Sequence, residues 1–396
     1  MAGRRRASRI PVLGLCLLLV ALVACGGRSP ADTERARVQH LLDRRAAAVL
    51  AHDAAAYGRT GTRDGFAGLR RVPLAGWSYR VTAVHRSGGT ATADADLRYR
   101  LRGYDTAPVT ASRTLRLTRT AGGGWYVAAD LPAPGSGQQL WDQGAVDVVR
   151  GSHSIVLGVG QPAATLRSYA ALADRAVPAV TRAWGADWPR HVVVLVPKAL
   201  EGMAGLLGSP ASAYRGIAAV TTGETGGTGR TPADRIIVNP DAYRTLGPLG
   251  RQVVLTHETT HVATRRATDG ATPLWLSEGY ADWIGYRGSG RTPAEAAPEL
   301  QRAVADGDVP ARLPGDEDFG FSGDATRLAQ AYEGGWLACR LIAERWGEER
   351  LGAFYRAVGA HEKRAGAEAD AMAEVLGTTP REFTALWQRY LRSELG

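Results

Sequence analysis

Apolar and polar residues follow two different rhythms in the first third of the chain. From residue 33 to about 57, Val38, Leu41, Leu42 and Val49 recur at three- and four-residue spacing, which predicts a helix. The pattern then changes to alternation with a period of two, which is typical of antiparallel strands. These strands are expected at residues 77–81, 92–101, 109–117 and 125–127, with glycine turns at 88–89 and 122–124 between them.

A second pattern begins after residues 131–137, which are rich in proline and glycine and have the composition of a linker. Apolar runs predict strands at 154–157, 191–196, 216–221 and 235–238, and an amphipathic helix over 164–184. After residue 286 the periodicity is almost wholly helical, with helices expected at 324–346, 348–359, 366–376 and 380–394.

The expected fold class is therefore α+β, with two domains. The first, residues 35–131, combines a helix with an antiparallel sheet, and the second, residues 146–396, has a mixed β half followed by an α-helical half. Residues 132–145 form the connecting linker. The first domain resembles the nuclear-transport-factor-2-like and cystatin-like folds, which pair a helix with a curved sheet. It carries no cluster of catalytic residue types, which favours a role as a spacer or a docking module.

The chemistry of the chain concentrates in the segment His257-Glu258-Thr259-Thr260-His261. Residues four apart share one face of a helix, so His257 and His261 can bind one metal ion together. Apolar residues at 253–255 and 262 predict that this helix is at least half-buried. Two histidines and a glutamate on a buried helix need partners, and a metal ion satisfies all three. The alternative is a solvated helix face that carries two histidines by chance.

A second segment, residues 274–282, supplies the missing ligand. Ser277 has the chemistry of an N-cap, and it precedes Glu278, which lies 17 positions after His261. A catalytic zinc ion usually keeps three protein ligands and one open position, and Glu278 is the natural third ligand. Asp282 lies on the same helix face as Glu278, where it can accept the free ring N–H of a ligand histidine. The alternative for Asp282 is an ordinary surface aspartate.

These segments resemble the gluzincin metallopeptidases, the superfamily of thermolysin and aminopeptidase N. Residues 275–281, Trp-Leu-Ser-Glu-Gly-Tyr-Ala, are similar to the Trp-Leu-Asn-Glu-Gly-Phe-Ala block of the aminopeptidase N family. Residues 332–335, Tyr-Glu-Gly-Gly, resemble its Tyr-Glu-Lys-Gly segment. The resemblance implies zinc held by His257, His261 and Glu278, with a peptide or protein as substrate. It also implies Glu258 as general base and acid, and Tyr332 as the group that stabilises the tetrahedral intermediate; a core aromatic is the alternative for Tyr332.

Several departures limit what the resemblance implies. Ser277 replaces an asparagine, Gly334 replaces a lysine, and the gap between His261 and Glu278 is shorter than usual. The family's Gly-Ala-Met-Glu-Asn segment, which helps to hold a free amino terminus, does not occur upstream of His257. Zinc hydrolysis is therefore implied over about residues 146–396, but aminopeptidase specificity is not. Residues 222–234 are rich in Gly and Thr, and form either a flap over the cleft or a plain surface loop.

Residues 1–25 have the pattern of a targeting segment. Four arginines precede an apolar run at 10–23 that is short for a membrane span, and the run ends in Leu-Val-Ala-Cys-Gly. This ending resembles the lipobox of bacterial lipoproteins, which implies cleavage before Cys25 and acylation of its new amino terminus. The expected location is the extracytoplasmic face of the cell membrane, with a lipid anchor and a tether at 26–34. The alternatives are an ordinary secretory signal and a short anchor helix.

Composition narrows the remaining possibilities. The formal net charge is +9, and without the four leader arginines it is about +5, which is modest for this length. No nucleic-acid-binding motif accompanies this charge, so we expect no nucleic-acid partner. Cys339 would be the single cysteine left after lipidation, and its apolar surroundings predict a buried, inert thiol. Oligomeric state and cleavage preference stay open. So do two rival functions: a non-catalytic zinc-containing scaffold, and a ligand-binding lipoprotein centred on the first domain.

Overall fold

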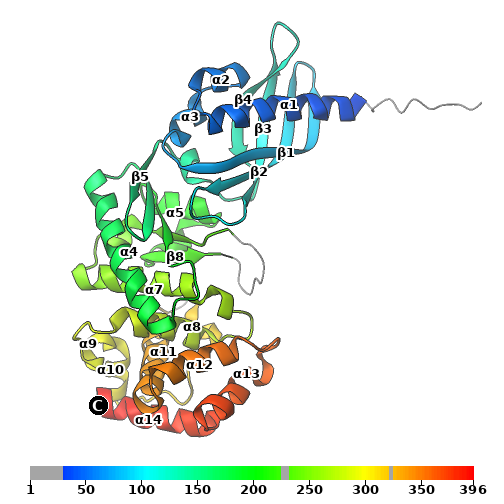
Figure 1. Ribbon diagram of the computed structural model, residues 1–396. Coiled ribbons are helices and arrows are strands. Elements are labelled where there is room, and N and C mark those ends of the chain that lie inside the picture. The colour runs from blue at the N-terminus through cyan, green and yellow to red at the C-terminus, as the bar shows by residue number, and fades with distance from the viewer. Residues whose placement is uncertain (1–29, 224–231, 321–323) are drawn as a thin grey trace, which may run out of the picture.

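The computed structural model describes residues 30–223, 232–320 and 324–396. It has the predicted α+β class, with an antiparallel four-stranded sheet, a mixed five-stranded sheet and a helical C-terminal part that follow one another along the molecule (Figure 1). The predicted leader, Cys25 and the first part of the tether lie outside the described residues. None of the helices described here is long and apolar enough to cross a membrane.

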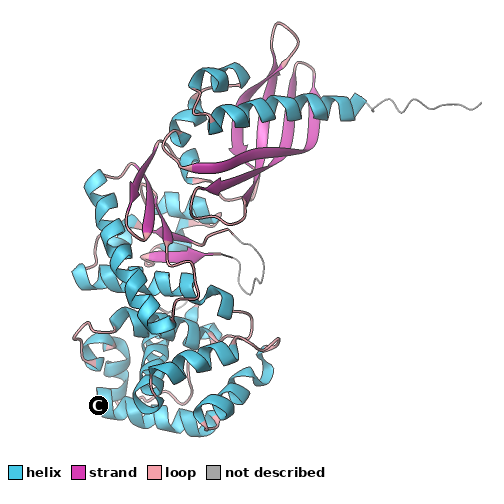
Figure 2. Cartoon of the chain, in the orientation of Figure 1, coloured by secondary structure: helices cyan, strands magenta, loops and turns pink. Residues whose placement is uncertain are grey.

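The first sheet has the order β1-β2-β3-β4 and is antiparallel throughout. Its strands are β1 (Leu74–Ser87), β2 (Thr90–Leu101), β3 (Val109–Arg119) and β4 (Trp125–Pro132), which include every strand predicted for this part of the chain. Helix α1 (Pro30–Leu50) lies across the sheet (Figure 2) and buries Val38 and Leu42 completely against it. The two-residue turn between β1 and β2 uses Gly88 in a left-handed conformation, with φ of 59°.

The helix predicted to continue to residue 57 ends earlier than expected. The chain leaves α1 at Leu50, and His52 takes a left-handed conformation with φ of 54°. Asp53 then caps a separate helix, α2 (Ala54–Thr60), because its carboxylate accepts the backbone N–H groups of Ala55 and Ala56. A third short helix, α3 (Asp64–Leu69), follows.

The second sheet has the order β5-β6-β7-β9-β8. Its strands are β5 (Val146–Arg150), β6 (Ser154–Val159), β7 (Val192–Val196), β8 (Ala219–Thr222) and β9 (Arg235–Val238). Strands β6, β7 and β9 are parallel, and helix α4 (Ala163–Trp184) connects the first two of them. Strand β8 is antiparallel to β9 and forms one edge of the sheet. Strand β5 is the one strand of this sheet that the sequence pattern did not predict.

Strands β6 and β7 are buried on both faces. Val156 and Val194 point into the core that contains α4 and the C-terminal helices. Their neighbours Ile155 and Val193 point to the opposite face, into a core that also contains Trp77 of the first sheet. Because alternate residues of a strand face opposite sides, these two strands join two hydrophobic cores. The first domain therefore shares a core with the second.

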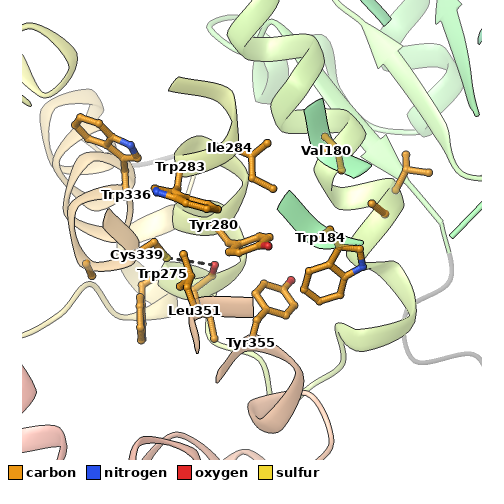
Figure 3. Close-up of a cluster of buried hydrophobic side chains, with 14 of the residues drawn as sticks. Val180, Trp184, Trp275, Tyr280, Trp283, Ile284, Trp336, Cys339, Leu351 and Tyr355 are labelled. Carbon is orange, nitrogen blue, oxygen red and sulfur yellow. Dashed lines mark hydrogen bonds between the residues drawn. The ribbon is translucent and has the colours of Figure 1, made fainter. Parts of the chain in front are cut away.

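The C-terminal part is helical, as predicted. Helices α5 (Leu200–Leu207) and α6 (Pro240–Tyr243) accompany the strands of the second sheet. The helices that follow are α7 (Pro248–Thr264), α8 (Leu274–Tyr286), α9 (Pro293–Ala296), α10 (Pro298–Ala305), α11 (Ala325–Trp346), α12 (Glu348–Val358), α13 (Arg364–Ala371) and α14 (Pro380–Leu395). Tyr280 of α8 packs edge-to-face against Trp184 and also contacts Tyr355, which fixes α8 between α4 and α12 (Figure 3). Cys339 is a buried free thiol whose pKa is raised by burial, in agreement with the inert role predicted for it.

Candidate active site

Helices α7 and α8 bring the three predicted metal ligands to one point. His257 and His261 lie one turn apart on α7, and Glu278 belongs to the first half of α8. The Nε2 atoms of the two histidines are 3.0 Å apart. The Glu278 Oε2 atom lies 3.2 Å from the Nε2 atom of His257 and 3.4 Å from that of His261. The three side chains thus present their donor atoms to a common centre.

This donor set fits a tetrahedral zinc site. Zinc–ligand bonds of about 2.0–2.1 Å at tetrahedral angles place two ligand atoms about 3.3 Å apart, close to the separations observed here. Two imidazoles and one carboxylate leave a fourth position open for a water molecule. His257, His261 and Glu278 can therefore hold a metal ion, and within residues 30–223, 232–320 and 324–396 they form the one group of ligand-type side chains this close together.

Asp282 fixes the orientation of one ligand. Its Oδ1 atom lies 2.7 Å from the Nδ1 atom of His257. With the proton on Nδ1, the Nε2 lone pair of His257 points to the common centre, which is the tautomer that a metal requires. Burial disfavours a charged His257, but Asp282 and Glu278 outweigh that effect and raise its pKa well above the usual value. Burial likewise raises the pKa of Glu278, yet the two histidines outweigh it and lower that pKa, so the carboxylate is ionised.

His257, His261 and Glu278 are called the metal group below, and Glu258 lies beside them. Glu258 is hydrogen-bonded to a residue that the sequence analysis did not single out. Its side chain is buried, and its Oε2 atom accepts a hydrogen bond of 2.6 Å from the Thr221 hydroxyl. Thr221 belongs to β8, the edge strand, which lies next to α7. The hydrogen bond occupies one carboxylate oxygen and leaves the other, Oε1, for a proton.

Tyr332 reaches the site from α11, because α8 and α11 approach each other closely. A Cβ atom on Gly279 would lie 2.3 Å from the backbone of Gly335, and one on Gly335 would lie 2.7 Å from the carbonyl oxygen of Trp275. Only glycine fits these two crossings. The Tyr332 ring centroid is 6.3 Å from that of His257. Burial and the neighbouring carboxylates raise the pKa of Tyr332 well above its ordinary value, so the phenol keeps its proton and can donate it.

The metal group opens into a cleft made of three adjoining cavities. The central cavity, of about 300 Å³, contains the three ligands, Glu258 and residues 219–221 of the edge strand. It shares Ile217 and Tyr332 with a larger, mostly apolar cavity of about 610 Å³. It shares Arg265 with a third cavity of about 210 Å³ at the junction with the first domain. The central cavity is therefore bordered by one cavity at Ile217 and Tyr332 and by another at Arg265.

The structure corrects one local prediction. Ser277 does not cap α8, because the helix already begins at Leu274, directly after Pro273. Ser277 instead lies buried inside the helix and lines the central cavity. Proline presets the helical φ and lacks the N–H that a cap would have to satisfy, which explains the earlier start. Cys25 and most of the predicted flap at 222–234 lie outside the described residues.

Comparisons with known proteins add little to this geometry. No protein-family model matches the chain, and no curated protein matches it. Among solved structures, the chain is similar to a crystal structure of an M1 zinc metallopeptidase variant from Deinococcus radiodurans bound to a Tyr-Ser-Ala substrate. The two chains are 14% identical, with a TM-score of 0.34. The match covers 77% of this chain and 62% of that one, so this chain spans less than two thirds of its length.

Proposed function

We propose that this protein is a zinc-dependent peptidase of the gluzincin type. The observation that carries the proposal is the convergence of His257, His261 and Glu278 beside a buried carboxylate, Glu258, and a protonated phenol, Tyr332. A structural zinc site closes its shell with four protein ligands, whereas three ligands and an open position are typical of catalysis. The resemblance of residues 275–281 and 332–335 to gluzincin motifs supports the same conclusion.

Each residue of the site has a role that its position supports. Bound zinc would supply Lewis acidity and bring the pKa of a coordinated water to about 7. Glu258 accepts the proton of the attacking water at its Oε1 atom, while Thr221 holds Oε2 and fixes the plane of the carboxylate. Glu258 then passes the proton to the leaving amine. The Tyr332 hydroxyl donates a hydrogen bond to the substrate oxygen as negative charge develops on it.

The substrate we infer is an extended peptide or protein chain. Strand β8 pairs with β9 along one side only, and its residues 219–221 line the central cavity. An unpaired strand edge offers backbone N–H and C=O groups that an extended peptide can match by adding a strand to the sheet. Such binding depends on the peptide backbone and therefore suits many sequences.

The large cavity beyond Tyr332 suits a bulky apolar side chain next to the scissile bond. Its lining is mostly apolar and includes Ile217, Tyr286, Leu328 and Trp336. Its volume of about 610 Å³ is within the range of pockets that enclose small ligands, and it exceeds what a small side chain would fill. We infer that peptides with a leucine or an aromatic residue at this position are cleaved faster than those with alanine.

We propose that this activity lies at a membrane surface, because residues 1–25 have the pattern of a lipoprotein leader. We propose that Cys25 carries lipid after cleavage of the leader, and that residues 26–34 tether the enzyme to the extracytoplasmic face of the cell membrane. The zinc site then meets extracytoplasmic proteins and peptides. We propose no nucleic-acid partner.

Metal analysis combined with a peptide-library digest tests the proposal. The purified chain should contain about one zinc per chain and should cleave members of a mixed peptide library. Glu258→Gln should keep the zinc and lose hydrolysis, because its amide cannot accept the proton of the water. Glu34→Gln is a matched control, since Glu34 is also buried but lies in α1 of the first domain.

The same experiment separates the proposal from its rival. Stoichiometric zinc without cleavage of any library member would favour a scaffold or binding lipoprotein that keeps the metal for structure. Cleavage that survives Glu258→Gln would refute the catalytic role of this carboxylate while leaving a hydrolase in place.

A further inference from the structure

The first domain reaches the substrate cleft through the loop between β2 and β3. Tyr104 and Thr106 of this loop line the 210 Å³ cavity at the domain junction. Arg265 lines the same cavity and also the central cavity that holds the metal group. Residues of the first domain therefore line a cavity that adjoins the central cavity at Arg265.

Asp105 fastens this loop to the second domain. Its carboxylate is completely buried and forms a two-pronged ion pair with Arg235 of β9, with both N–O distances at 2.9 Å. It also accepts hydrogen bonds from the backbone N–H groups of Leu101, at 2.6 Å, and Ala233, at 2.9 Å. Because each oxygen of Asp105 meets two donors, the loop on either side of it is held in one place.

A further polar contact connects this part of β9 to α7, the helix that carries His257 and His261. Asp234, next to Arg235, accepts a hydrogen bond of 2.9 Å from Arg265. Arg265 lies four residues after the ligand His261, at the end of α7. The shared hydrophobic core beneath β6 and β7 adds a second attachment between the two domains. The position of Tyr104 relative to the metal group is therefore set by packing and by charge.

We propose that Tyr104 is a specificity-determining residue and that the first domain forms one wall of the substrate-binding cleft. The proposal rests on the proposed peptidase function and names its substrate class: peptides long enough to extend from the metal group to the domain junction. The Tyr104 ring packs edge-on against His191 at a centroid distance of 5.0 Å, which presents a rigid aromatic surface to a bound chain.

The edge strand sets the direction in which a peptide would extend. Thr222 at the end of β8 pairs with Arg235, which Asp105 binds, so this end of the strand lies at the domain junction. Ile217, just before the strand, lines the large apolar cavity. Antiparallel pairs of strands are about two to three times as common as parallel ones. An antiparallel peptide would place its amino-terminal part against Tyr104.

A length series of peptides tests this proposal on the full chain. The background variant is Glu258→Gln with zinc bound, so that no peptide is cleaved during the measurement. The probes are the best-bound acetylated and amidated tetrapeptide from the library, and the same peptide extended by Ala-Leu-Ala-Leu at its amino or its carboxyl end. Dissociation constants come from isothermal titration. We expect the amino-terminal extension to tighten binding about tenfold, and Tyr104→Ala to remove most of this gain.

Two matched variants keep the result specific. Tyr126→Ala removes a half-buried tyrosine from β4 and should leave the gain from the extension unchanged. Asp105→Asn weakens a buried ion pair with Arg235, and Asp142→Asn weakens a partly buried one with Arg113. Only Asp105 holds the loop, so only Asp105→Asn should reduce the gain.

The outcomes distinguish failure of this proposal from failure of the proposed peptidase function. Equal dissociation constants for the four- and eight-residue peptides would overturn the role of the first domain. So would a gain in affinity that Tyr104→Ala leaves unchanged. Neither result would contradict the proposed peptidase function. Failure of every peptide to bind the zinc-loaded chain would overturn the proposed function, and this proposal with it.

Discussion

Two groups of titratable side chains in this protein are built in opposite ways. Asp105 and Arg235 at the domain junction cancel each other's charge, and every oxygen of Asp105 has two hydrogen-bond donors. At the metal group, His257, His261 and Glu278 direct their ligand atoms at one centre, where the contacts between them join like and unlike groups alike. The first group is closed, and the second is one that we propose a metal ion completes.

The difference shows how to tell a structural charge cluster from a functional one. Burying charge is costly unless each group is paired and hydrogen-bonded, so a closed cluster can stay buried without a partner from outside the chain. Ligand atoms that converge without a complete set of partners also destabilise the fold. The free energy of binding a metal ion can offset this destabilisation. The number of partners for each oxygen and nitrogen therefore carries more information than burial does.

His261→Ala breaks the open group and should have the largest effect. With one of its three ligands gone, the site should lose its zinc, and hydrolysis should disappear with it. Zinc per chain after dialysis against a weak chelator measures the loss. His153→Ala is the control, because His153 comes just before β6 and lines none of the three cavities of the cleft. Normal zinc content in His261→Ala would show that the ligands are assigned wrongly.

Asp105→Ala breaks the closed group, with an effect on stability. Arg235 would be left buried without its counter-charge, and breaking a buried pair by removing one partner costs about 3–5 kcal/mol. Urea denaturation should record this loss while the zinc content stays near one per chain. Replacing Asp105 and Arg235 together by apolar residues should cost less, because no lone charge remains. Zinc lost in proportion to stability would mean that the two groups are not separate.

Asp282→Asn tests the connection between the metal group and its surroundings. Asn can still hold the His257 ring but no longer supplies a negative charge, and losses of tenfold to a hundredfold in metal affinity are typical for such partners. Competition with a chelator of known zinc affinity measures the change. Asp370→Asn, on an exposed part of α13, should leave the affinity unchanged. Equal affinities for wild type and Asp282→Asn would reduce Asp282 to an ordinary aspartate.

Glu333 represents an intermediate case and should give the smallest effect. Its carboxylate accepts the backbone N–H groups of Glu299 and Leu300 at the start of α10, yet burial outweighs these bonds and raises its pKa from 4.5 to about 7. A carboxyl group that binds its proton more tightly when folded favours folding at low pH, and this contribution is lost as the pH rises through 7. Wild type should therefore lose stability relative to Glu333→Gln between about pH 5 and about pH 8 in urea titrations. Parallel curves for the two proteins would contradict the raised pKa.

Much of the fold followed from the sequence because its elements are long and regular. The period of two in the first sheet and the apolar stripes of α4 and α11 are local signals, and the structure confirms them. The break after Leu50 was missed because the apolar spacing continues past it, while the capping bond of Asp53 to Ala55 and Ala56 is a feature of side-chain geometry. Strand β5 was missed because Asp147 and Arg150 interrupt its apolar run.

Some contacts of the candidate site could likewise be predicted from the sequence, and others could not. The ligands and Asp282 lie within 26 consecutive residues, so the spacing within each helix and the short connection between the two helices were enough to predict that they meet. Thr221 meets Glu258 only because β8 is the edge strand beside α7, and Asp105 meets Arg235 across 130 positions of the chain. Contacts of this kind depend on sheet order and on the docking of domains, which a single sequence does not encode in any local pattern.

The two-faced burial of β6 and β7 also constrains how this chain can be divided and folded. A fragment beginning at residue 146 would expose the row that contains Ile155, Leu157 and Val193, and an exposed apolar face of this kind promotes aggregation. The same cut would separate Trp77 and Trp141 from β6 and β7, with which they share a core. The chain should therefore melt as one cooperative unit, and a ribosome must release the whole first sheet and β7 before either core can close.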